Sequence, residues 1–355
     1  METIRTLCAQ YFQLVEVPAL FIPPGEVLIQ QNVQTALYER MFDESLNLPP
    51  ATYRTRVLKE IIARIESSVK DPEEDEILDD LMTSLGSLLA QPKPSALQQA
   101  QQLSHVKYTA PLTSSTTTSD RTVTTIESRG LILSGGTTGN RTWEAALHLG
   151  SFLATEAGEA LVRNKRVIEL GAGTGFLSLF CARHLGVRTV VSTDREPVLI
   201  DNIRECAILN RDSNEEIPIY PAVWNWGTPL EVTEEMEHIV EGERPEFEIA
   251  LGADLIYDTD LVPLLLSTVR DLFDNYHVGE FIISATMRNE KTFQTFLTGC
   301  ETNSFKVECI PFQSTAADEQ SGFFHSTSIP IKTYRISRAE RRSSCHVNWA
   351  LEAFD

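Results

Sequence analysis

The sequence of 355 residues predicts an α/β fold with a largely parallel sheet, preceded by a helical N-terminal region. Three observations carry this prediction. Apolar residues recur at helical spacing before residue 103, and short β-branched runs alternate with helical stretches after residue 135. The first of those runs leads directly into a glycine-rich turn. Such alternation is typical of βαβ units with helices on both faces of a parallel sheet.

Residues 1–103 are predicted to form helices. The segments Tyr53–Val69 and Glu76–Leu89 carry apolar residues at helical spacing, and proline pairs separate the helical stretches. We interpret the acidic run Asp71–Asp80 as the solvated start of a helix, because Asp and Glu are favoured in a first helical turn. A face for docking a partner is the alternative. The region contains no catalytic constellation.

Residues 104–134 are predicted to be a linker with a β-hairpin. Between Thr113 and Asp120 the chain is almost entirely Ser and Thr, which indicates a loop. Two short β-like runs follow, Thr122–Ile126 and Leu131–Ser134, and a Glu-Ser-Arg-Gly link separates them. This spacing predicts that the two runs pair with each other.

Residues 135–336 are predicted to form the sheet domain, followed by a loosely attached tail over 337–355. Five β-like runs alternate with four helical stretches, and two further runs pair as a terminal antiparallel hairpin, giving seven strands. The expected strands are Arg166–Leu170, Thr189–Thr193, Ile217–Val223, Glu248–Gly252, Glu280–Ala285, Phe305–Ile310 and Thr327–Ile336, and the expected helices are Phe176–Leu185, Pro197–Leu209, Leu261–Phe273 and Glu290–Cys300.

The net charge of the chain indicates which classes of partner it can bind. With 50 acidic and 30 basic residues, the formal net charge is −20. Such a field repels phosphate backbones, so we expect no nucleic-acid substrate. It favours a basic partner, or it only keeps the protein soluble, and the composition does not decide between the two.

Cysteine usage and hydropathy set the expected compartment. The six cysteines show no C-x-x-C pair and no His-flanked ligand spacing, so we expect no metal site. Scattered free thiols suit a reducing compartment. No apolar stretch approaches the ~20 residues that cross a bilayer, and the N-terminus lacks the features of a secretory signal. We therefore expect a cytoplasmic monomer without membrane contact.

The glycine-rich turn is the main functional motif. The strand Arg166–Leu170 leads into Gly171-Ala172-Gly173-Thr174-Gly175, where glycine permits positive φ and close approach of a ligand to the backbone. A nicotinamide fingerprint would need glycine at the position of Phe176. Glu169, two residues before the turn, can engage the amino group of an amino-acid-like ligand and would repel a pyrophosphate. A purely structural turn is the alternative.

Two further positions predict an adenosine ligand. Asp194 ends the second strand, where a carboxylate reaches the ribose hydroxyls. Trp224 and Trp226 follow the third strand, and an aromatic ring there can stack on adenine. We favour Trp226, because it lies beyond the strand end, although either ring could belong to the core.

The fourth strand ends in Asp254-Leu255-Ile256-Tyr257. In doubly wound sheets the carboxyl ends of the first and fourth strands flank the crevice at which the strand order reverses. Asp254 and Tyr257 are therefore expected where a second substrate approaches the bound ligand. The alternative is that Asp254 only caps the following turn.

These motifs together resemble the seven-β-strand lysine methyltransferase group known as family sixteen. The group's marks are a Trp-containing segment before the first strand, an E-x-G-x-G-x-G loop and D-x-x-Y after the fourth strand. They stand here as Thr137–Ala146 with Trp143, as Glu169–Gly175 and as Asp254–Tyr257. Within the group, the Gly-Thr-Thr-Gly segment, Met287–Glu290 and the helical extension are most similar to the elongation factor 2 lysine methyltransferases.

The resemblance implies a Rossmann-like methyltransferase that uses S-adenosylmethionine (AdoMet) to methylate a lysine of a protein, elongation factor 2. It implies that Asp254 and Tyr257 orient the lysine. Asn225 stands where the group usually has Asp, which leaves open which tryptophan meets adenine. The residues expected to bind AdoMet are Trp143, Glu169, Gly171, Ala172, Gly173, Asp194, Trp226 and Ala253.

Three other functions compete with this one. A small-molecule methyltransferase would share the cofactor site, but the Trp143 segment and the D-x-x-Y element favour a protein lysine. A non-catalytic AdoMet-binding module is opposed by the intact glycine turn, Asp194 and Asp254. A nicotinamide dehydrogenase is disfavoured by Phe176.

Overall fold

The structure is a computed structural model of the chain. The residues that it describes are 4–71, 75–112, 120–128, 137–212, 216–240 and 244–339.

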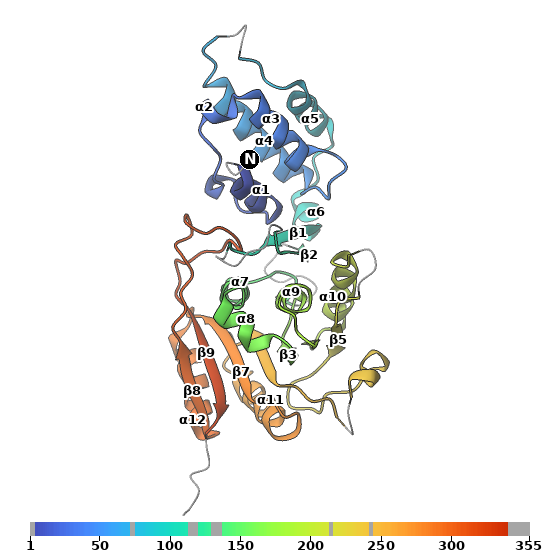
Figure 1. The fold of residues 1–355 in the computed structure, drawn as a ribbon, viewed down its shortest axis with the longest axis vertical. Coiled ribbons are helices and arrows are strands. Elements are labelled where there is room, and N and C mark those ends of the chain that lie inside the picture. The colour runs from blue at the N-terminus through green and yellow to red at the C-terminus, as the bar shows by residue number, and fades with distance from the viewer. Residues whose placement is uncertain are drawn as a thin grey trace, which may run out of the picture.

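A seven-stranded sheet forms the centre of the larger unit, in the order β5-β4-β3-β6-β7-β9-β8 (Figure 1). The first five strands in this order are parallel, and β9 runs antiparallel between β7 and β8. This confirms the predicted α/β sheet with its terminal antiparallel hairpin. The strands are β3 Arg166–Leu170, β4 Thr189–Asp194, β5 Ile219–Val223, β6 Ile249–Ala253, β7 Glu280–Thr286, β8 Phe305–Ile310 and β9 Ile331–Arg338.

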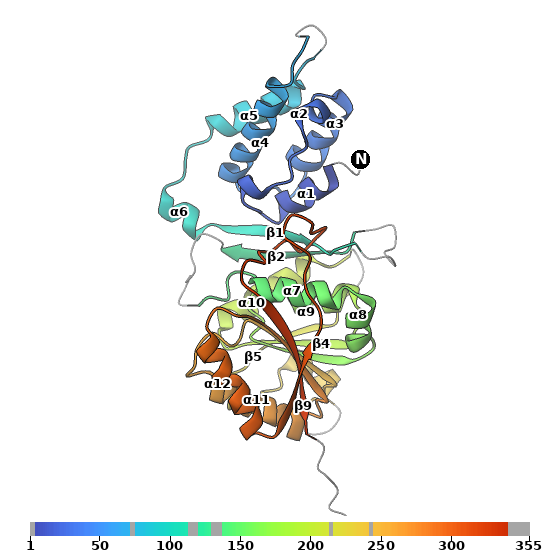
Figure 2. The same cartoon turned by 90° about the vertical axis from the view of Figure 1, so that its left-hand side faces the viewer.

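Helices cover both faces of the sheet (Figure 2). One apolar cluster joins the first face to α7, α8, α9 and α10, and a second joins the opposite face to α11 and α12. Strands β3, β4 and β6 are buried over nearly their whole length, as expected for strands covered on both sides. The helices are α7 Glu144–Leu153, α8 Glu156–Val162, α9 Phe176–His184, α10 Pro197–Leu209, α11 Val262–Asn275 and α12 Glu290–Thr302, with a 3₁₀ helix η4 at Glu234–Ile239.

The N-terminal region is helical, as predicted, and has its own apolar core. The periodicity near Val57 produces α4 (Ala51–Glu66), which buries one stripe of side chains. The predicted helix over Glu76–Leu89 starts later, at Asp79, so only Asp79 and Asp80 of the acidic run occupy a first turn. The other elements are α1 Arg5–Phe12, η2 Val17–Ala19, α2 Gly25–Leu28, α3 Gln31–Leu37, the π-helical η3 Tyr38–Phe42, α5 Asp79–Ala90 and α6 Ala96–Gln101.

A two-stranded ribbon lies between the helical region and the sheet (Figure 2). Strand β2 (Thr122–Ser128) contains the predicted run, but it pairs antiparallel with β1 (Leu103–Thr109). The predicted hairpin partner, Leu131–Ser134, and most of the Ser/Thr-rich loop lie outside the described residues. The predicted pairing of these two runs therefore stays a prediction, but sequence reasoning missed β1 as a strand and as a partner of β2. Burial of Val106 and Tyr108 of β1 stabilises this pair.

Contacts distant in the sequence attach the helical region to the rest. The Gln13 side chain of the N-terminal region forms two hydrogen bonds with the backbone of Phe324, accepting from its N at 3.0 Å and donating to its carbonyl oxygen at 2.5 Å. Arg5 of α1 pairs with Asp120, just before β2, at 2.6 Å. Within the part of the chain that the structure describes, no helix is both long and apolar enough to cross a membrane.

Candidate active site

The candidate site lies at the carboxyl ends of β3, β4 and β6. From β3 the chain winds to β4 and β5 on one side, and then crosses to β6 and β7 on the other. Doubly wound proteins bind their ligands at such a reversal of strand order, in the crevice beyond the strand ends.

The turn from β3 to α9 presents bare backbone to this crevice. Gly171 and Gly173 have φ values of +59° and +54°, which side chains disfavour. A Cβ on Gly171 would lie 2.6 Å from Leu255 Cδ2, and one on Gly173 would lie 3.0 Å from the carbonyl oxygen of Gly139. The turn therefore needs glycine, and it meets both the loop after β6 and the segment before α7. Between the two glycines, the backbone N of Ala172 donates to Thr193 O of β4 at 2.8 Å.

Glu169 stabilises the glycine turn from its buried side. Its side chain is buried, and its Oε2 accepts hydrogen bonds from the backbone N of Ser178, at 2.9 Å, and from the Ser178 hydroxyl in the first turn of α9. Burial raises the pKa of the Glu169 carboxyl to about 8, against the opposing effect of the Ser178 hydrogen bonds. The side chain therefore holds a proton at neutral pH.

This raised pKa predicts a pH-dependent stability. The folded-state pKa of about 8 lies above the ordinary 4.5, so the contribution of Glu169 is complete below pH 4.5 and is lost as the pH rises through 8. Wild-type protein should lose thermal stability between about pH 5 and about pH 9 more steeply than Glu169→Gln, whose amide does not titrate. Unfolding midpoints of the two proteins at both pH values test this. Parallel pH dependence would contradict it.

Asp194, at the end of β4, is joined directly to the turn. Its Oδ2 accepts from the backbone N of Gly173 at 3.0 Å, and its Oδ1 accepts from the backbone N of Glu196 at 3.2 Å. Burial raises the pKa of Asp194, and these backbone hydrogen bonds oppose the rise. The carboxylate predicted to meet a ribose thus lies beside the bare glycine backbone.

The two tryptophans after β5 have different surroundings. Trp224 is buried, donates from Nε1 to Thr228 O at 2.8 Å and lies 6.1 Å from the Tyr276 ring. Trp226 is partly buried, and its Cζ2 lies 3.7 Å from the point that a Cβ on Gly171 would occupy. Trp224 is therefore a core residue, and Trp226 lies beside the glycine turn.

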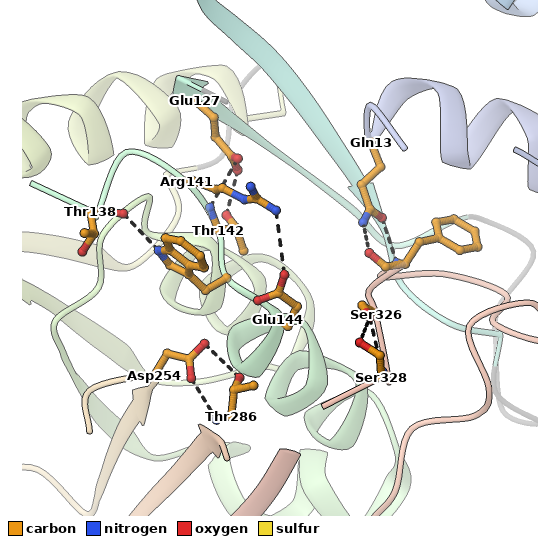
Figure 3. Close-up of polar contacts among 12 residues, drawn as sticks. Gln13, Glu127, Thr138, Arg141, Thr142, Glu144, Asp254, Thr286, Ser326 and Ser328 are labelled. Atoms are coloured by element: carbon orange, nitrogen blue, oxygen red, sulfur yellow. Dashed lines mark hydrogen bonds and ion pairs between the residues drawn. The ribbon is translucent and has the colours of Figure 1, made fainter. Parts of the chain in front are cut away.

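Trp143 approaches the turn from the other side. It precedes the first residue of α7, and its Nε1 donates to Thr138 O at 3.0 Å (Figure 3). The neighbouring Gly139 is the residue that approaches Gly173. The Arg141 guanidinium carbon lies 5.2 Å from the centre of the Trp143 ring. The Trp-containing segment and the glycine turn are thus parts of one wall.

Asp254 follows the last residue of β6, the partly exposed Ala253. It has a φ of +54°, and its carboxylate reaches across to the end of β7. Oδ1 accepts from Thr286 N at 2.9 Å, and Oδ2 accepts from Thr286 Oγ1 at 3.1 Å (Figure 3). Arg288 Nη1 lies 3.2 Å from Oδ2. Its described contacts therefore lead to the neighbouring strand end, and not to a cap on its own turn.

Tyr257 lies on the exposed side of the crevice, with 58% of its surface accessible. Its pKa is raised, first by partial burial of the hydroxyl and then by Asp194 and Asp258, while Arg195 opposes the rise. The charges at the end of β4 therefore act on this phenol.

Sequence reasoning missed Glu127 of β2, which connects the ribbon to the site. Its Oε1 accepts from the hydroxyls of Tyr108, Thr125 and Thr142, each at 2.7 Å. Figure 3 shows the contact with Thr142. Thr142 Oγ1 also lies 2.7 Å from Thr174 Oγ1 in the glycine turn. The only signal in the sequence is an acidic residue at an inward position of an alternating β run.

Replacing Glu127 by Ala should lower the free energy of unfolding by about 3 kcal/mol or more, because buried hydroxyls lose their acceptor at about 1–3 kcal/mol each. Urea unfolding measures this. Glu127→Gln keeps one carbonyl acceptor and should lose less. Glu205→Ala, which removes an exposed glutamate of α10, is the matched control. A cost for Glu127→Ala no larger than that of the control would contradict the role of this network.

The family model described as lysine methyltransferase matches residues 132–303. Protein-lysine N-methyltransferase EFM3 of Chaetomium thermophilum is 40% identical over 341 residues, which cover 95% of this chain and 98% of the relative. EEF1A lysine methyltransferase 3 of Mus musculus is 29% identical over 168 residues, 47% of this chain and 64% of the relative. Protein-lysine N-methyltransferase EEF2KMT of Homo sapiens is 26% identical over 263 residues, 70% of each chain.

The matched span holds the Trp143 segment, the glycine turn, Asp194, Trp226 and the Asp254–Tyr257 element. The structure places these motifs at the carboxyl ends of β3, β4, β5 and β6 and at the start of α7. The chain belongs to the lysine methyltransferase family and is a protein-lysine N-methyltransferase.

Proposed function

We propose that the crevice at the ends of β3, β4 and β6 binds AdoMet, the cofactor that membership of a methyltransferase family implies. The residues present fit this ligand. The backbone at Gly171 and Gly173 is bare where a side chain would clash, and the Asp194 carboxylate beside it suits a ribose diol. The Trp226 indole next to Gly171 suits adenine. This convergence of turn, carboxylate and ring is the observation that carries the proposal.

The remaining cofactor contacts come from the wall of the crevice. We propose that Glu169 engages the amino group directly or through water, while its Oε2 holds Ser178, and that the positive charge of the amino group then stabilises the carboxylate form of Glu169. Trp143, Ala172 and Ala253 line the site. When bound, AdoMet supplies an electrophilic methyl group on a sulfonium.

The acceptor is proposed to enter between Asp254 and Tyr257. A lysine side chain, with an ordinary pKa of about 10.4, must first lose a proton to solvent. Its Nζ lone pair then forms the new C–N bond as the C–S bond breaks, and the sulfur keeps the electron pair. Asp254 and Tyr257 hold the amine in line with the methyl group, and such positioning supplies much of the acceleration.

We propose that the target is a translation elongation factor, and place elongation factor 2 first. The motifs most similar to the elongation factor 2 methyltransferases support this choice, as does the human relative EEF2KMT, which aligns with 70% of this chain. Elongation factor 1A is the second candidate, because the mouse relative named for it is slightly more identical, at 29% against 26%, over a shorter span. Either target would place the protein in the cytoplasm.

Purified protein, labelled AdoMet and each purified elongation factor test the target. We expect label on a lysine of elongation factor 2, and none with Asp254→Asn as the catalytic control. Label on elongation factor 1A alone would transfer the proposal to the second candidate. Label on neither would reject both.

We further propose that residues 1–103 form a unit of their own, with 104–134 as a connection, 135–336 as the catalytic domain and 337–355 as a tail. The separate apolar core of the N-terminal helices supports this division. Deleting residues 1–103 and measuring AdoMet binding separately from protein methylation distinguishes a substrate-recognising unit from a structural cover.

A further inference from the structure

Arg288, two residues after the end of β7, connects the acceptor side of the site to the cofactor side. Its Nη1 lies 3.2 Å from Asp254 Oδ2, and its Nη2 lies 2.7 Å from Glu144 Oε2 of α7. Its guanidinium carbon lies 5.4 Å from the centre of the Trp143 ring. One cation therefore contacts both the Asp254 motif and the Trp143 segment.

The Asp254 carboxylate is held firmly in this arrangement. Its side chain is only 9% exposed, and both of its oxygens also accept hydrogen bonds from Thr286. Arg288 adds a positive charge to these neutral donors. The negative charge of Asp254 is therefore balanced by a residue of this chain before a substrate lysine arrives.

This balance matters because only the neutral amine can attack. A carboxylate next to an ammonium group stabilises the charged form and raises the lysine pKa. We propose that Arg288 is a positioning residue that neutralises Asp254, so that the carboxylate orients the lysine without holding it as the unreactive ammonium. This inference rests on the proposed role of Asp254 in binding the lysine.

Other charged groups surround the pair, and they would be retained in a variant of Arg288. Glu144 also faces Arg141, whose Nη2 lies 3.8 Å from its Oε1. A change caused by losing Arg288 therefore reports on that single cation. The further charged and titratable groups around the crevice are Asp194, Arg195 and Glu196 from the end of β4, and Tyr257 and Asp258 from the loop after β6.

The pH dependence of kcat tests the proposal, because kcat reports the ionisation of the enzyme–substrate complex. It is measured on the full chain with saturating AdoMet and elongation factor. Arg288→Ala should move the acidic limb of the kcat–pH profile to higher pH by about one unit. This is the lower end of the range of pKa shifts that one nearby charge causes. Its rate near pH 7 should therefore fall about tenfold and recover in alkali. Arg288→Lys keeps the charge and should keep the wild-type limb.

Arg141→Ala is the matched control. Arg141 also pairs with Glu144 and lies against the Trp143 ring, but its described contacts do not include Asp254. Its loss should lower the rate without moving the limb. An unshifted limb in Arg288→Ala, or an equal shift in Arg141→Ala, would overturn the proposal. If Arg288→Ala fails to fold, Arg288→Gln carries the same expectation. Absence of methylation by the wild-type protein would reject the proposed function itself.

Discussion

Replacing Asp254 by Ala is expected to lower kcat by about 10²-fold or more, the effect of misplacing a reacting group, while AdoMet affinity stays nearly unchanged. Two consequences of the substitution act together. The lysine loses the acceptor that orients it, and the Arg288 guanidinium, 3.2 Å from Asp254 Oδ2 in the structure, is left facing the incoming ammonium group without its carboxylate. Methylation kinetics and calorimetric titration with AdoMet separate the two readouts.

Asp254→Asn is the control for folding. Asp254 has a φ of +54°, a conformation that Asn tolerates, whereas Ala there costs about 1–2 kcal/mol. Asn should therefore abolish turnover with less loss of thermal stability than Ala. Its amide has one acceptor oxygen and one donor nitrogen, so it cannot keep all three contacts that the Asp254 carboxylate makes with Thr286 N, Thr286 Oγ1 and Arg288. Turnover like that of the wild type in Asp254→Asn would refute the assigned role.

Asp194→Ala should weaken AdoMet binding by about 10- to 100-fold, because hydrogen bonds to a charged group contribute about 1.5–3 kcal/mol. The variant loses the proposed bonds to the ribose and also the acceptor for the backbone N of Gly173, at 3.0 Å. The dissociation constant is measured by calorimetry.

The matched control for this prediction is Asp201→Ala. Asp201 lies on α10, is largely exposed and pairs with Arg204 at 3.0 Å. An exposed pair of this kind contributes little, so AdoMet affinity should not change. A dissociation constant for Asp194→Ala equal to that of this control would remove Asp194 from the cofactor site.

The sheet could be predicted because its signals are local. β-branched runs such as Arg166–Leu170 are buried on both faces, so hydrophobicity marks them directly. The ends of the strands were predicted less accurately. The last strand begins at Ile331, not at Thr327, because Pro330 lacks the N–H that strand pairing needs.

The strand β1 was missed because its pairing with β2 is not local. Thr122–Ser128 pairs with the upstream Leu103–Thr109, which the sequence analysis did not assign to a strand. A sequence pattern shows which faces alternate but not which distant strand supplies the matching face. For the same reason the role of Glu127 could not be predicted, since its three hydroxyl partners come from three segments.

The places of the glycine turn and Asp194 could be predicted more fully than the contacts around Asp254. The glycine turn and Asp194 follow directly after strands, where the fold fixes their position. The choice between Trp224 and Trp226 needed burial, which places Trp224 in the core. Arg288 carried no signal by itself, because its partners Glu144 and Asp254 lie 144 and 34 residues away in the sequence.

Family membership sets aside the nicotinamide dehydrogenase and favours a protein lysine over a small molecule. The Trp143 segment, the glycine turn and the Asp254 element come from separate parts of the chain, and the reversal of strand order at β3 and β6 brings them to one crevice.

The most direct test of methyl transfer to a protein lysine at this crevice uses an extract from cells that lack the protein. The extract is incubated with labelled AdoMet and either the wild-type chain or Asp254→Asn, and the labelled residue is located by mass spectrometry. The account predicts one wild-type-dependent band near the size of elongation factor 2, with the label on a lysine side chain. No labelled protein, or equal labelling by Asp254→Asn, would contradict it.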